Sequence, residues 1–245
     1  MTRLSRHSQA NVDVWRADAA ARSDGAWLAL DGLALHSTGI PLPYWNGAVL
    51  TEEHGLQSLP EAVDWFAARQ MPWGLMIPAD FDAAPPGLEL VMEQPVMLRS
   101  LDDLPEAPDL ELRWDAGEEA SAVQAEAFET DLDLSARFVL PKLACPSGSV
   151  VVGYDGGQPV ATATLFTSGG VAAVYGVGTV VNRRRSGFGY AVTLAVLHEA
   201  ARLGCDLAYL NPSPMAYGVY CALGFEDAAP NRIYRTLAET DLAAV

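Results

Sequence analysis

The chain is organised around residues 174–190, VYGVGTVVNRRRSGFGY. The apolar run over 174–181 predicts a buried strand, and the Ala-, Leu- and Val-rich residues 190–203 predict a helix with a wide apolar face. The turn between them holds three arginines, followed by Gly187 and Gly189. Small residues let backbone N–H groups approach an anion, and a helix N-terminus adds a partial positive charge. The stretch therefore predicts a phosphate-binding turn between a strand and a helix.

The composition limits the partners that suit such a turn. The 245 residues carry 31 acidic and 15 basic side chains, a formal net charge of −16. We therefore expect no nucleic-acid and no membrane partner, because both kinds of surface need a positive field. An acidic surface fits a cationic or amine-bearing substrate, although solubility alone explains it equally well. The length allows one large domain or two small ones.

The cysteines and histidines predict neither a disulfide framework nor a metal site. Three cysteines have no CxxC spacing, and four scattered histidines form no HExxH pattern. We therefore expect no metal and a reducing, cytoplasmic location. The N-terminal residues lack the apolar core of a signal peptide, and no uncharged apolar run approaches the ~20 residues that span a bilayer.

Periodicity and turn signals predict a mixed α/β chain. Asp31-Gly32 and Asp155-Gly156-Gly157 mark hairpins, and Ser58 with Glu61 has the spacing of a helix-capping box. The predicted helices cover 12–22, 58–67, 116–128, 132–143, 190–203 and 215–223. The predicted strands cover 26–30, 33–35, 47–51, 73–77, 88–98, 109–114, 150–154, 159–166, 171–181, 207–210 and 225–238.

An acidic segment over 100–106 contains proline, lacks periodicity and predicts a linker. We therefore expect two domains, 1–99 and 107–245.

The two halves look like a degenerate repeat. The order strand, helix, strand, loop, strand over 47–98 parallels the order over 171–238. After its strand, the first half has Glu52 and Glu53, which are carboxylates where an anion site needs donors. Only the C-terminal copy is therefore expected to bind a phosphate compound.

Two motifs in the C-terminal half belong together by their spacing. The first is Arg184-x-x-Gly187-x-Gly189 after a strand, and the second is Ala216-x-x-x-Tyr220-x-x-x-Gly224-Phe225. Together they resemble the pyrophosphate loop and the C-terminal segment of the GNAT superfamily of acyl-CoA-dependent N-acyltransferases. The resemblance covers roughly residues 108–238. It implies an α/β (α+β) fold, a mixed and mostly antiparallel sheet flanked by helices. Residues 1–99 resemble the decayed second unit of some bacterial members, which implies two tandem GNAT-like units.

The resemblance also implies how acetyl-CoA would bind. The strand before the loop would splay from its neighbour and offer main-chain groups to the pantetheine arm around Val177, Gly178 and Thr179. The pyrophosphate would lie in a cradle of backbone N–H groups from Arg184, Arg185, Ser186, Gly187, Phe188 and Gly189. Arg183, Arg184 or Arg185 could also pair with the 3′-phosphate. The alternative for this cluster is a solvated turn.

Tyr220 is the candidate catalytic residue that the resemblance implies. A phenol placed at the sulfur of a thioester can protonate the departing thiolate as a general acid. The alternative is a core aromatic at helical spacing from Ala216 and Gly224.

No general base is evident from spacing. The carboxylates on the helices that border the acceptor site in this family are Glu118, Glu119, Glu126 and Asp131. Each is equally well explained as part of a solvated helix face. Tyr175 and Tyr209 lie on the central predicted strands and could hold a water molecule.

The chain departs from the family pattern at three places, the first of which is Val181, where the family often has proline. Arg185 stands where the family often has glycine, and it could tighten phosphate binding or reshape the turn. Ser213 stands where the family often has asparagine, with Asn211 two residues earlier. Either Ser213 or Asn211 could still hydrogen-bond the pantetheine.

These observations predict an N-acetyltransferase that moves the acetyl group of acetyl-CoA to a primary amine by direct attack in a ternary complex. One alternative is an acyltransferase that uses a longer acyl-CoA or an acyl-carrier protein. The other is a non-catalytic CoA-binding sensor or interaction module. No pattern in the sequence identifies the acceptor, which is a small-molecule or peptide amine. None identifies the oligomeric state either, which is a monomer or a homodimer.

Overall fold

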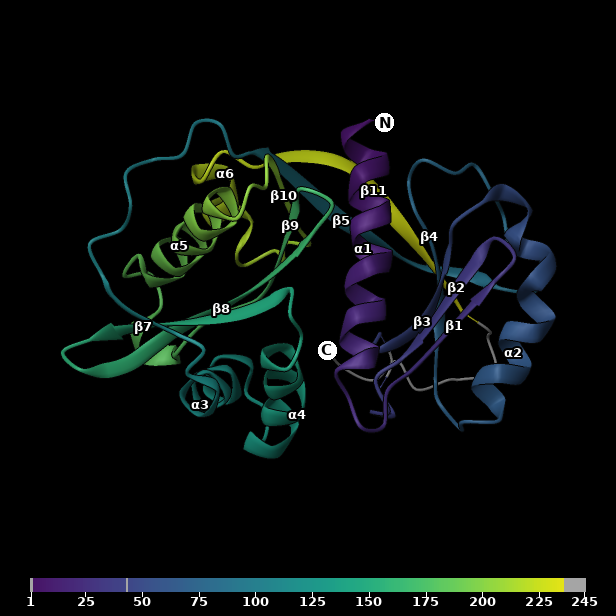
Figure 1. The fold of residues 1–245 in the computed structure, drawn as a ribbon, viewed down its shortest axis with the longest axis horizontal. Coiled ribbons are helices and arrows are strands. Elements are labelled where there is room, and N and C mark those ends of the chain that lie inside the picture. The colour runs from purple at the N-terminus through teal and green to yellow at the C-terminus, as the bar shows by residue number, and fades with distance from the viewer. Residues whose placement is uncertain (1, 43, 236–245) are drawn as a thin grey trace. The chain divides into compact units, whose positions relative to one another are not determined.

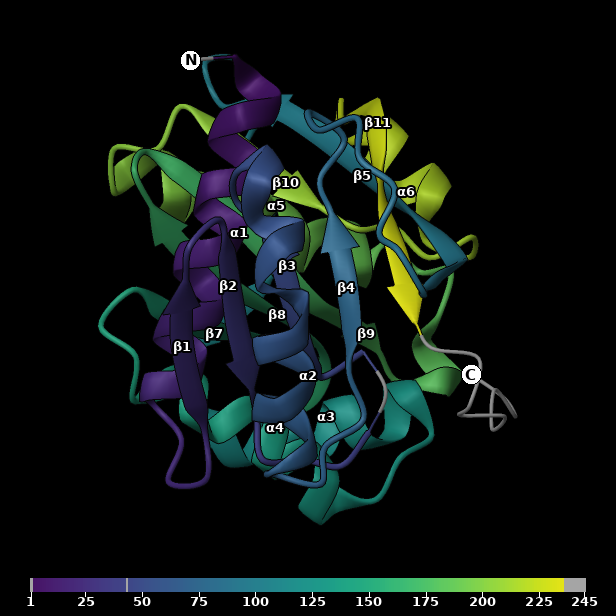
Figure 2. The same cartoon turned by 90° about the vertical axis from the view of Figure 1, so that its right-hand side faces the viewer.

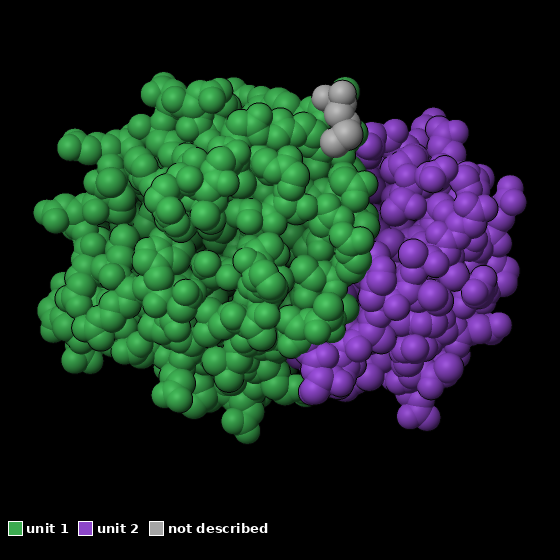
Figure 3. Space-filling model, viewed as in Figure 1, with its two compact units in different colours: residues 1–21, 96–228 green, residues 22–95, 229–245 purple. Residues whose placement is uncertain are grey.

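The computed structural model describes residues 2–42 and 44–235, which form two compact units (Figures 1 and 3). Of the described residues, unit 1 contains 2–21 and 96–228, and unit 2 contains 22–42, 44–95 and 229–235. This division differs from the predicted domains 1–99 and 107–245, because the N-terminal helix packs within unit 1. Residues 236–238 of the last predicted strand lie outside the described residues.

Unit 1 is a mostly antiparallel sheet with helices on both faces, as predicted. Its strands are paired in the order β5-β10-β9-β8-β7-β6, and only the β9–β10 pair is parallel. The helices are α1 (Arg3–Ala20), α3 (Gly117–Phe128), α4 (Leu132–Leu143), η2 (Val181–Arg183), α5 (Phe188–Arg202) and α6 (Tyr217–Ala222). The strands are β5 (Glu89–Ser100), β6 (Glu111–Trp114), β7 (Gly148–Asp155), β8 (Gln158–Ser168), β9 (Val171–Thr179) and β10 (Leu207–Leu210).

Alternation along β9 separates the two cores of this sheet. Ala172 and Val174 pack with α5 and α6 on one face. Val171 and Ala173 pack with α1 on the other, where α3 and α4 also lie (Figure 1). The first four side chains of β9 therefore alternate between the α5 side and the α1 side of the sheet.

The first helix is longer than its sequence pattern predicts. The periodicity suggested a helix over 12–22, whereas α1 begins at Arg3, capped by the Thr2 side chain. The buried face of α1 includes His7, Asn11 and Asp18. A helix that buries polar groups shows no clean apolar stripe, which explains why its first turns were missed.

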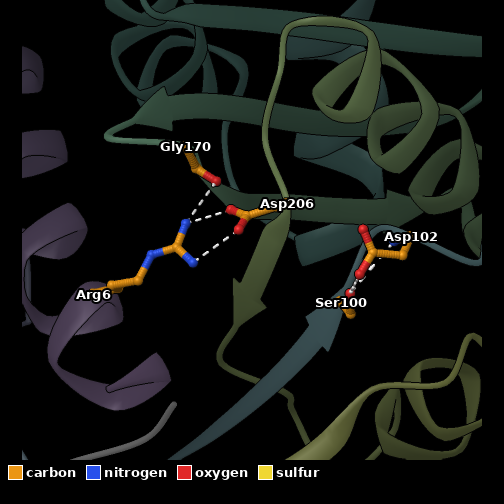
Figure 4. Close-up of polar contacts among 5 residues, drawn as sticks. All are labelled: Arg6, Ser100, Asp102, Gly170 and Asp206. Carbon is orange, nitrogen blue, oxygen red and sulfur yellow. Dashed lines mark hydrogen bonds and ion pairs between the residues drawn. The ribbon is translucent and has the colours of Figure 1, made fainter. Parts of the chain in front are cut away.

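Polar contacts anchor α1 to the sheet of unit 1 (Figure 4). The Arg6 guanidinium pairs with both carboxylate oxygens of Asp206, one of them at 3.0 Å, and donates to the Gly170 carbonyl at 3.3 Å. Further along the helix, Ser168 donates to the Asp13 carboxylate at 2.7 Å. These contacts fix α1 to the end of β8, to the turn before β9 and to the residue before β10.

Unit 2 is a smaller sheet covered by one helix (Figure 2). Its strand order is β1-β2-β3-β4-β11, and only β3 and β4 are parallel. The elements are β1 (Ala26–Leu30), β2 (Leu33–Ser37), β3 (Asn46–Leu50), η1 (Glu53–Ser58), α2 (Leu59–Ala67), β4 (Gly74–Ile77) and β11 (Glu226–Arg235). Both β5 and β11 cross a unit boundary along the chain.

The predicted capping box at Ser58 is wrong. The Ser58 side chain makes no capping hydrogen bond to α2 and instead donates to the Asp31 carbonyl at 2.9 Å. The β1–β2 turn therefore uses the hydroxyl that the sequence pattern assigned to the helix.

The two units repeat one order of elements. In unit 1, β9 leads through α5 to the parallel strand β10, and in unit 2, β3 leads through η1 and α2 to the parallel strand β4. An antiparallel strand from the other half of the chain then completes each sheet: β5 pairs with β10, and β11 pairs with β4.

Within the described residues, no helix has the length and apolar character needed to cross a membrane. The same residues contain no cluster of His, Cys, Asp and Glu side chains that could hold a metal ion. The three cysteines are free thiols.

Candidate active site

The site lies where β9 and β10 separate. The two strands pair only from Val171 to Ala173, although β9 continues to Thr179. Beyond that point the β8–β9 register shifts, and Gly176 takes φ +57°. Such a bulge bends a strand and disrupts its ladder locally. β10 itself ends at Leu210, so the described backbone of β9 beyond Ala173 has no pairing with β10. That leaves the strand edge that the family resemblance requires for a pantetheine arm.

The residues predicted for the pantetheine arm line this second half of β9. Val177 packs against the α5 side of the sheet. A Cβ atom on Gly178 would lie 2.8 Å from the Cβ of Ala127 and 3.2 Å from the Phe128 ring. Gly178 therefore lets α3 approach the strand closely, a structural role that the motif did not reveal.

The loop after β9 forms an open N-terminus for α5. Gly187 is the N-cap with φ +85°, and a Cβ atom there would meet nothing within 4 Å. No side chain caps the helix, and within the described residues the backbone N–H groups of 185–190 donate no hydrogen bond. Consecutive free N–H groups at a helix N-terminus fit an anion.

The three arginines of this loop have different roles. Arg183 pairs with Asp155 at 3.2 Å. Arg184 donates from its side chain to the Ala127 carbonyl at 2.8 Å and from its backbone to Val181. Arg184 thus ties the loop to the end of α3, and its predicted place in the N–H cradle is not supported.

Arg185 is the loop arginine whose side chain remains available. It is exposed, and it makes no hydrogen bond or ion pair to the described residues. Its φ of +62° lies in the left-handed region. That region favours glycine, which explains why the motif usually has glycine at this position.

Tyr220 lies on α6 and is buried, with 5% of its surface exposed. Its ring meets Phe225 edge to face, with centroids 6.0 Å apart. Burial raises the pKa of the phenol to about 12. The hydroxyl therefore keeps its proton at neutral pH, as a general acid must. It shares the α5-side core with Val177 and Leu210.

The two residues predicted after β10 occupy the approach to α6. Ser213 is exposed, and its carbonyl accepts hydrogen bonds from the backbone of Ala216 and Tyr217. Ser213 therefore shapes the turn that begins α6. Asn211 is partly buried directly after β10.

Two of the four candidate carboxylate bases have structural partners. Asp131 caps α4 by accepting from the Leu134 backbone at 2.7 Å, as the sequence suggested. Glu119 lies 3.7 Å from Arg113. Glu118 and Glu126 are exposed on α3. The geometry favours none of the four as the base.

A polar cluster on the α1 side was missed in part by sequence reasoning. The hydroxyls of Tyr175 and Tyr209 lie 2.8 Å apart, and each contacts the Asn11 Oδ1 atom, at 3.1 and 3.3 Å. Burial raises the pKa of both phenols above their ordinary value. Gln124 of α3 is buried beside Gly176. Neither Asn11 nor Gln124 carries a signal in the sequence, because no spacing links them to the loop.

The mostly antiparallel sheet with helices on both faces, with an open helix N-terminus after its bulged strand, matches the fold of GCN5-related N-acetyltransferases. More particularly, the chain belongs to the family described as "Probable histone acetyltransferase Rv0428c C-terminal", whose model matches residues 8–234. Membership makes it an acetyltransferase at the level of the family. No curated protein matches the sequence.

Solved structures agree on the fold. A GCN5-related N-acetyltransferase from Kribbella flavida is 24% identical, covers 96% of each chain and superposes with a TM-score of 0.73. A putative acetyltransferase of the GNAT family from Novosphingobium aromaticivorans is 19% identical, with 85% of this chain and 89% of that one covered and a TM-score of 0.55. A tandem GNAT protein of the clavulanic acid pathway is 14% identical, with 93% of each chain covered and a TM-score of 0.57.

Proposed function

We propose that this protein transfers the acetyl group of acetyl-CoA to a primary amine by direct attack in a ternary complex. The observation that carries the proposal is the combination, within unit 1, of the open N-terminus of α5 with the unpaired half of β9 and the buried Tyr220. An anion-binding turn alone would suit many nucleotides. The adjoining strand edge and a protonated phenol suit a thioester with an amide-rich arm.

The residues present fit coenzyme A. The free backbone N–H groups of 185–190 would hold the pyrophosphate, since Gly187 leaves their surface open. Arg185 is placed on the same loop to pair with a further phosphate. The strand edge from Val177 to Thr179 would hydrogen-bond the amides of the pantetheine arm. The bound coenzyme supplies the activated acetyl group.

Tyr220 would donate the proton that the leaving thiol needs. Its raised pKa keeps the hydroxyl neutral through the physiological range. A phenol buried among apolar side chains also excludes water, which protects a thioester from hydrolysis.

The proposed acceptor is a cationic amine, either a small molecule or a peptide. The net charge of −16 favours the approach of such a substrate over a neutral or acidic one. The family description names a histone acetyltransferase, so a lysine-rich peptide is one candidate. The free thiols fit a reducing cytoplasm.

We further propose that unit 2 is a degenerate GNAT-like repeat. The matching order of strands and crossover helix in the two units supports this. Unit 2 has Glu52 before η1 where unit 1 has its arginine and glycine loop. His54 is held between Asp31 at 2.8 Å and Glu52 at 3.7 Å, so this turn presents carboxylates rather than anion donors.

Thiol release from acetyl-CoA over a panel of amines tests the function. The panel contains polyamines, aminoglycosides, lysine-rich peptides and acidic peptides, and calorimetry measures coenzyme binding separately. We expect coenzyme binding together with amine-dependent thiol release that is highest for cationic acceptors. If a longer acyl-CoA or an acylated carrier protein reacted faster than acetyl-CoA, the transferred group would be that longer acyl chain and not acetyl. Tight coenzyme binding without turnover over the whole panel would favour a sensor.

A further inference from the structure

We propose that the Tyr175 hydroxyl and the Gln124 carboxamide orient the acceptor amine, and that Asn11 of α1 positions Tyr175 for this task. This inference rests on the proposed acetyl transfer and adds the residues that receive its second substrate. It gives a role in the site to a helix that the sequence assigned to the other domain.

The location of Tyr175 suits an attacking amine. Tyr175 directly precedes the bulge at Gly176, where β9 has left β10. Its side chain belongs to the α1 side of the sheet, whereas Tyr220 belongs to the α5 side. A nucleophile and a proton donor for the leaving group should approach a thioester from different sides. The two tyrosines meet that condition.

The hydrogen-bond network determines what Tyr175 can offer. Three hydrogen-bond contacts join the hydroxyls of Tyr175 and Tyr209 and the Asn11 Oδ1 atom, but only the two hydroxyls carry a proton to donate. The Asn11 oxygen can only accept, so a chain of donation must end there. Whether Tyr175 donates to Tyr209 or to Asn11, its proton is used within the cluster. The Tyr175 oxygen is therefore left as an acceptor, and it suits a ligand that donates N–H groups.

Gln124 of α3 provides a second, independent polar group beside Gly176, the residue that follows Tyr175 on β9. Its side chain is 7% exposed, and it makes no hydrogen bond to the described residues. Its Nε2 atom lies 3.3 Å from where a Cβ of Gly176 would be, and Thr164 Oγ1 lies 3.5 Å from that point. The Gln124 amide has no partner among the described residues but is not sealed from solvent, so its oxygen is available to a ligand. An amine offers the donors that both oxygens need.

Asn11 holds this arrangement from outside the family motifs. It belongs to α1, which Arg6 and Asp13 fasten to the sheet near the starts of β9 and β10. Asn11 does not need to touch the amine. It acts by accepting from the phenols, which keeps the Tyr175 oxygen turned toward the substrate.

The test uses n-butylammonium as a probe, so that it does not depend on acyl transfer. Saturation-transfer NMR in the presence of saturating CoA measures its dissociation constant on the full-length protein. Loss of one hydrogen bond to a charged ligand should raise that constant about tenfold in Tyr175→Phe and in Gln124→Ala. Calorimetry should find CoA affinity within about twofold of the parent, because neither side chain lies in the phosphate cradle.

Further variants separate positioning from folding. Asn11→Ala should weaken n-butylammonium binding, whereas Asn11→Asp keeps an acceptor oxygen and should retain it. Tyr209→Phe should have a smaller effect than Tyr175→Phe, because Tyr175 can then donate to Asn11 directly. Tyr154→Phe removes a buried hydroxyl on β7 outside the cluster and should leave the dissociation constant for n-butylammonium unchanged.

The outcomes are decisive for this inference alone. Absence of probe binding to the parent protein, or equal binding to the parent, Tyr175→Phe and Gln124→Ala, would overturn the amine subsite. Equal loss in Asn11→Ala and Asn11→Asp would overturn the positioning role. Failure of CoA binding or of thiol release would instead refute the proposed function.

Discussion

In the proposed reaction, Tyr220 acts through a single hydroxyl. We expect Tyr220→Phe to lower kcat by about 10²-fold, within the range that general-acid catalysis contributes. The ring and its edge-to-face contact with Phe225 remain, so the coenzyme dissociation constant should change little. Steady-state kinetics with calorimetry checks this, and full activity of the variant would remove Tyr220 from the mechanism.

The raised pKa of Tyr220 also predicts a pH dependence of stability. Burial places this pKa at about 12 in the folded chain, against about 10 when unfolded. Because the folded value is higher, the contribution of the neutral phenol is complete below about pH 10 and is lost as the pH rises toward 12. Urea denaturation from pH 8 to 11.5 should show a steeper alkaline loss for the parent than for Tyr220→Phe. If the stability of the parent and of Tyr220→Phe fell in parallel with rising pH, the raised pKa of Tyr220 would be contradicted.

Arg185 combines backbone strain with an available guanidinium. We expect Arg185→Gly to leave the free energy of unfolding within about 1 kcal/mol, because relief of the left-handed strain is offset by the freedom of glycine in the unfolded chain. Coenzyme binding should weaken about tenfold through loss of a charged hydrogen bond.

Dephospho-CoA tests whether Arg185 contacts the 3′-phosphate of the coenzyme. The parent should prefer CoA to dephospho-CoA, and Arg185→Gly should bind both equally if the contact is with the 3′-phosphate. Arg183→Gln is the matched control, since Arg183 already pairs with Asp155. If Arg185→Gly still preferred CoA to dephospho-CoA, Arg185 would not contact the 3′-phosphate.

At the scale of elements, the approach of α3 to β9 depends on Gly178. We expect Gly178→Ala to destabilise the protein by about 1–3 kcal/mol, because the added methyl would lie 2.8 Å from the Cβ of Ala127. The coenzyme dissociation constant should rise as well, since α3 and the loop are joined through Arg184. Gly218→Ala on α6, where a methyl meets nothing, is the control and should not destabilise. Equal stability of the two variants would contradict this packing.

At the scale of the whole molecule, the candidate site lies within one of two units with separate cores. Phe66 is fully buried in unit 2 and stacks on Trp73 with centroids 4.7 Å apart. We expect Phe66→Ala to lower the free energy of unfolding by about 3–5 kcal/mol. The dissociation constant for CoA, measured at low temperature on the folded fraction, should stay within about twofold. A large loss of affinity would show that unit 2 contributes to the site.

Local signals in the sequence were sufficient for much of the fold. The hairpins around Asp31 and Asp155, the cap at Asp131 and most element positions follow from turn chemistry and periodicity, which act between near neighbours. The same holds for the loop at Gly187, because φ +85° strongly favours glycine.

The sequence by itself determined the class of fold, the candidate anion-binding loop and the candidate tyrosine, since each motif depends on residues a few positions apart. Only the tertiary structure decided where α1 belongs, what Arg184 holds and which side chains surround Tyr175. Asn11 and Tyr175 are 164 residues apart, and Arg184 and Ala127 are 57 apart. No periodicity operates over such separations. These contacts form because the fold brings distant segments of the chain together, and buried polar groups there are stable only when they are hydrogen-bonded.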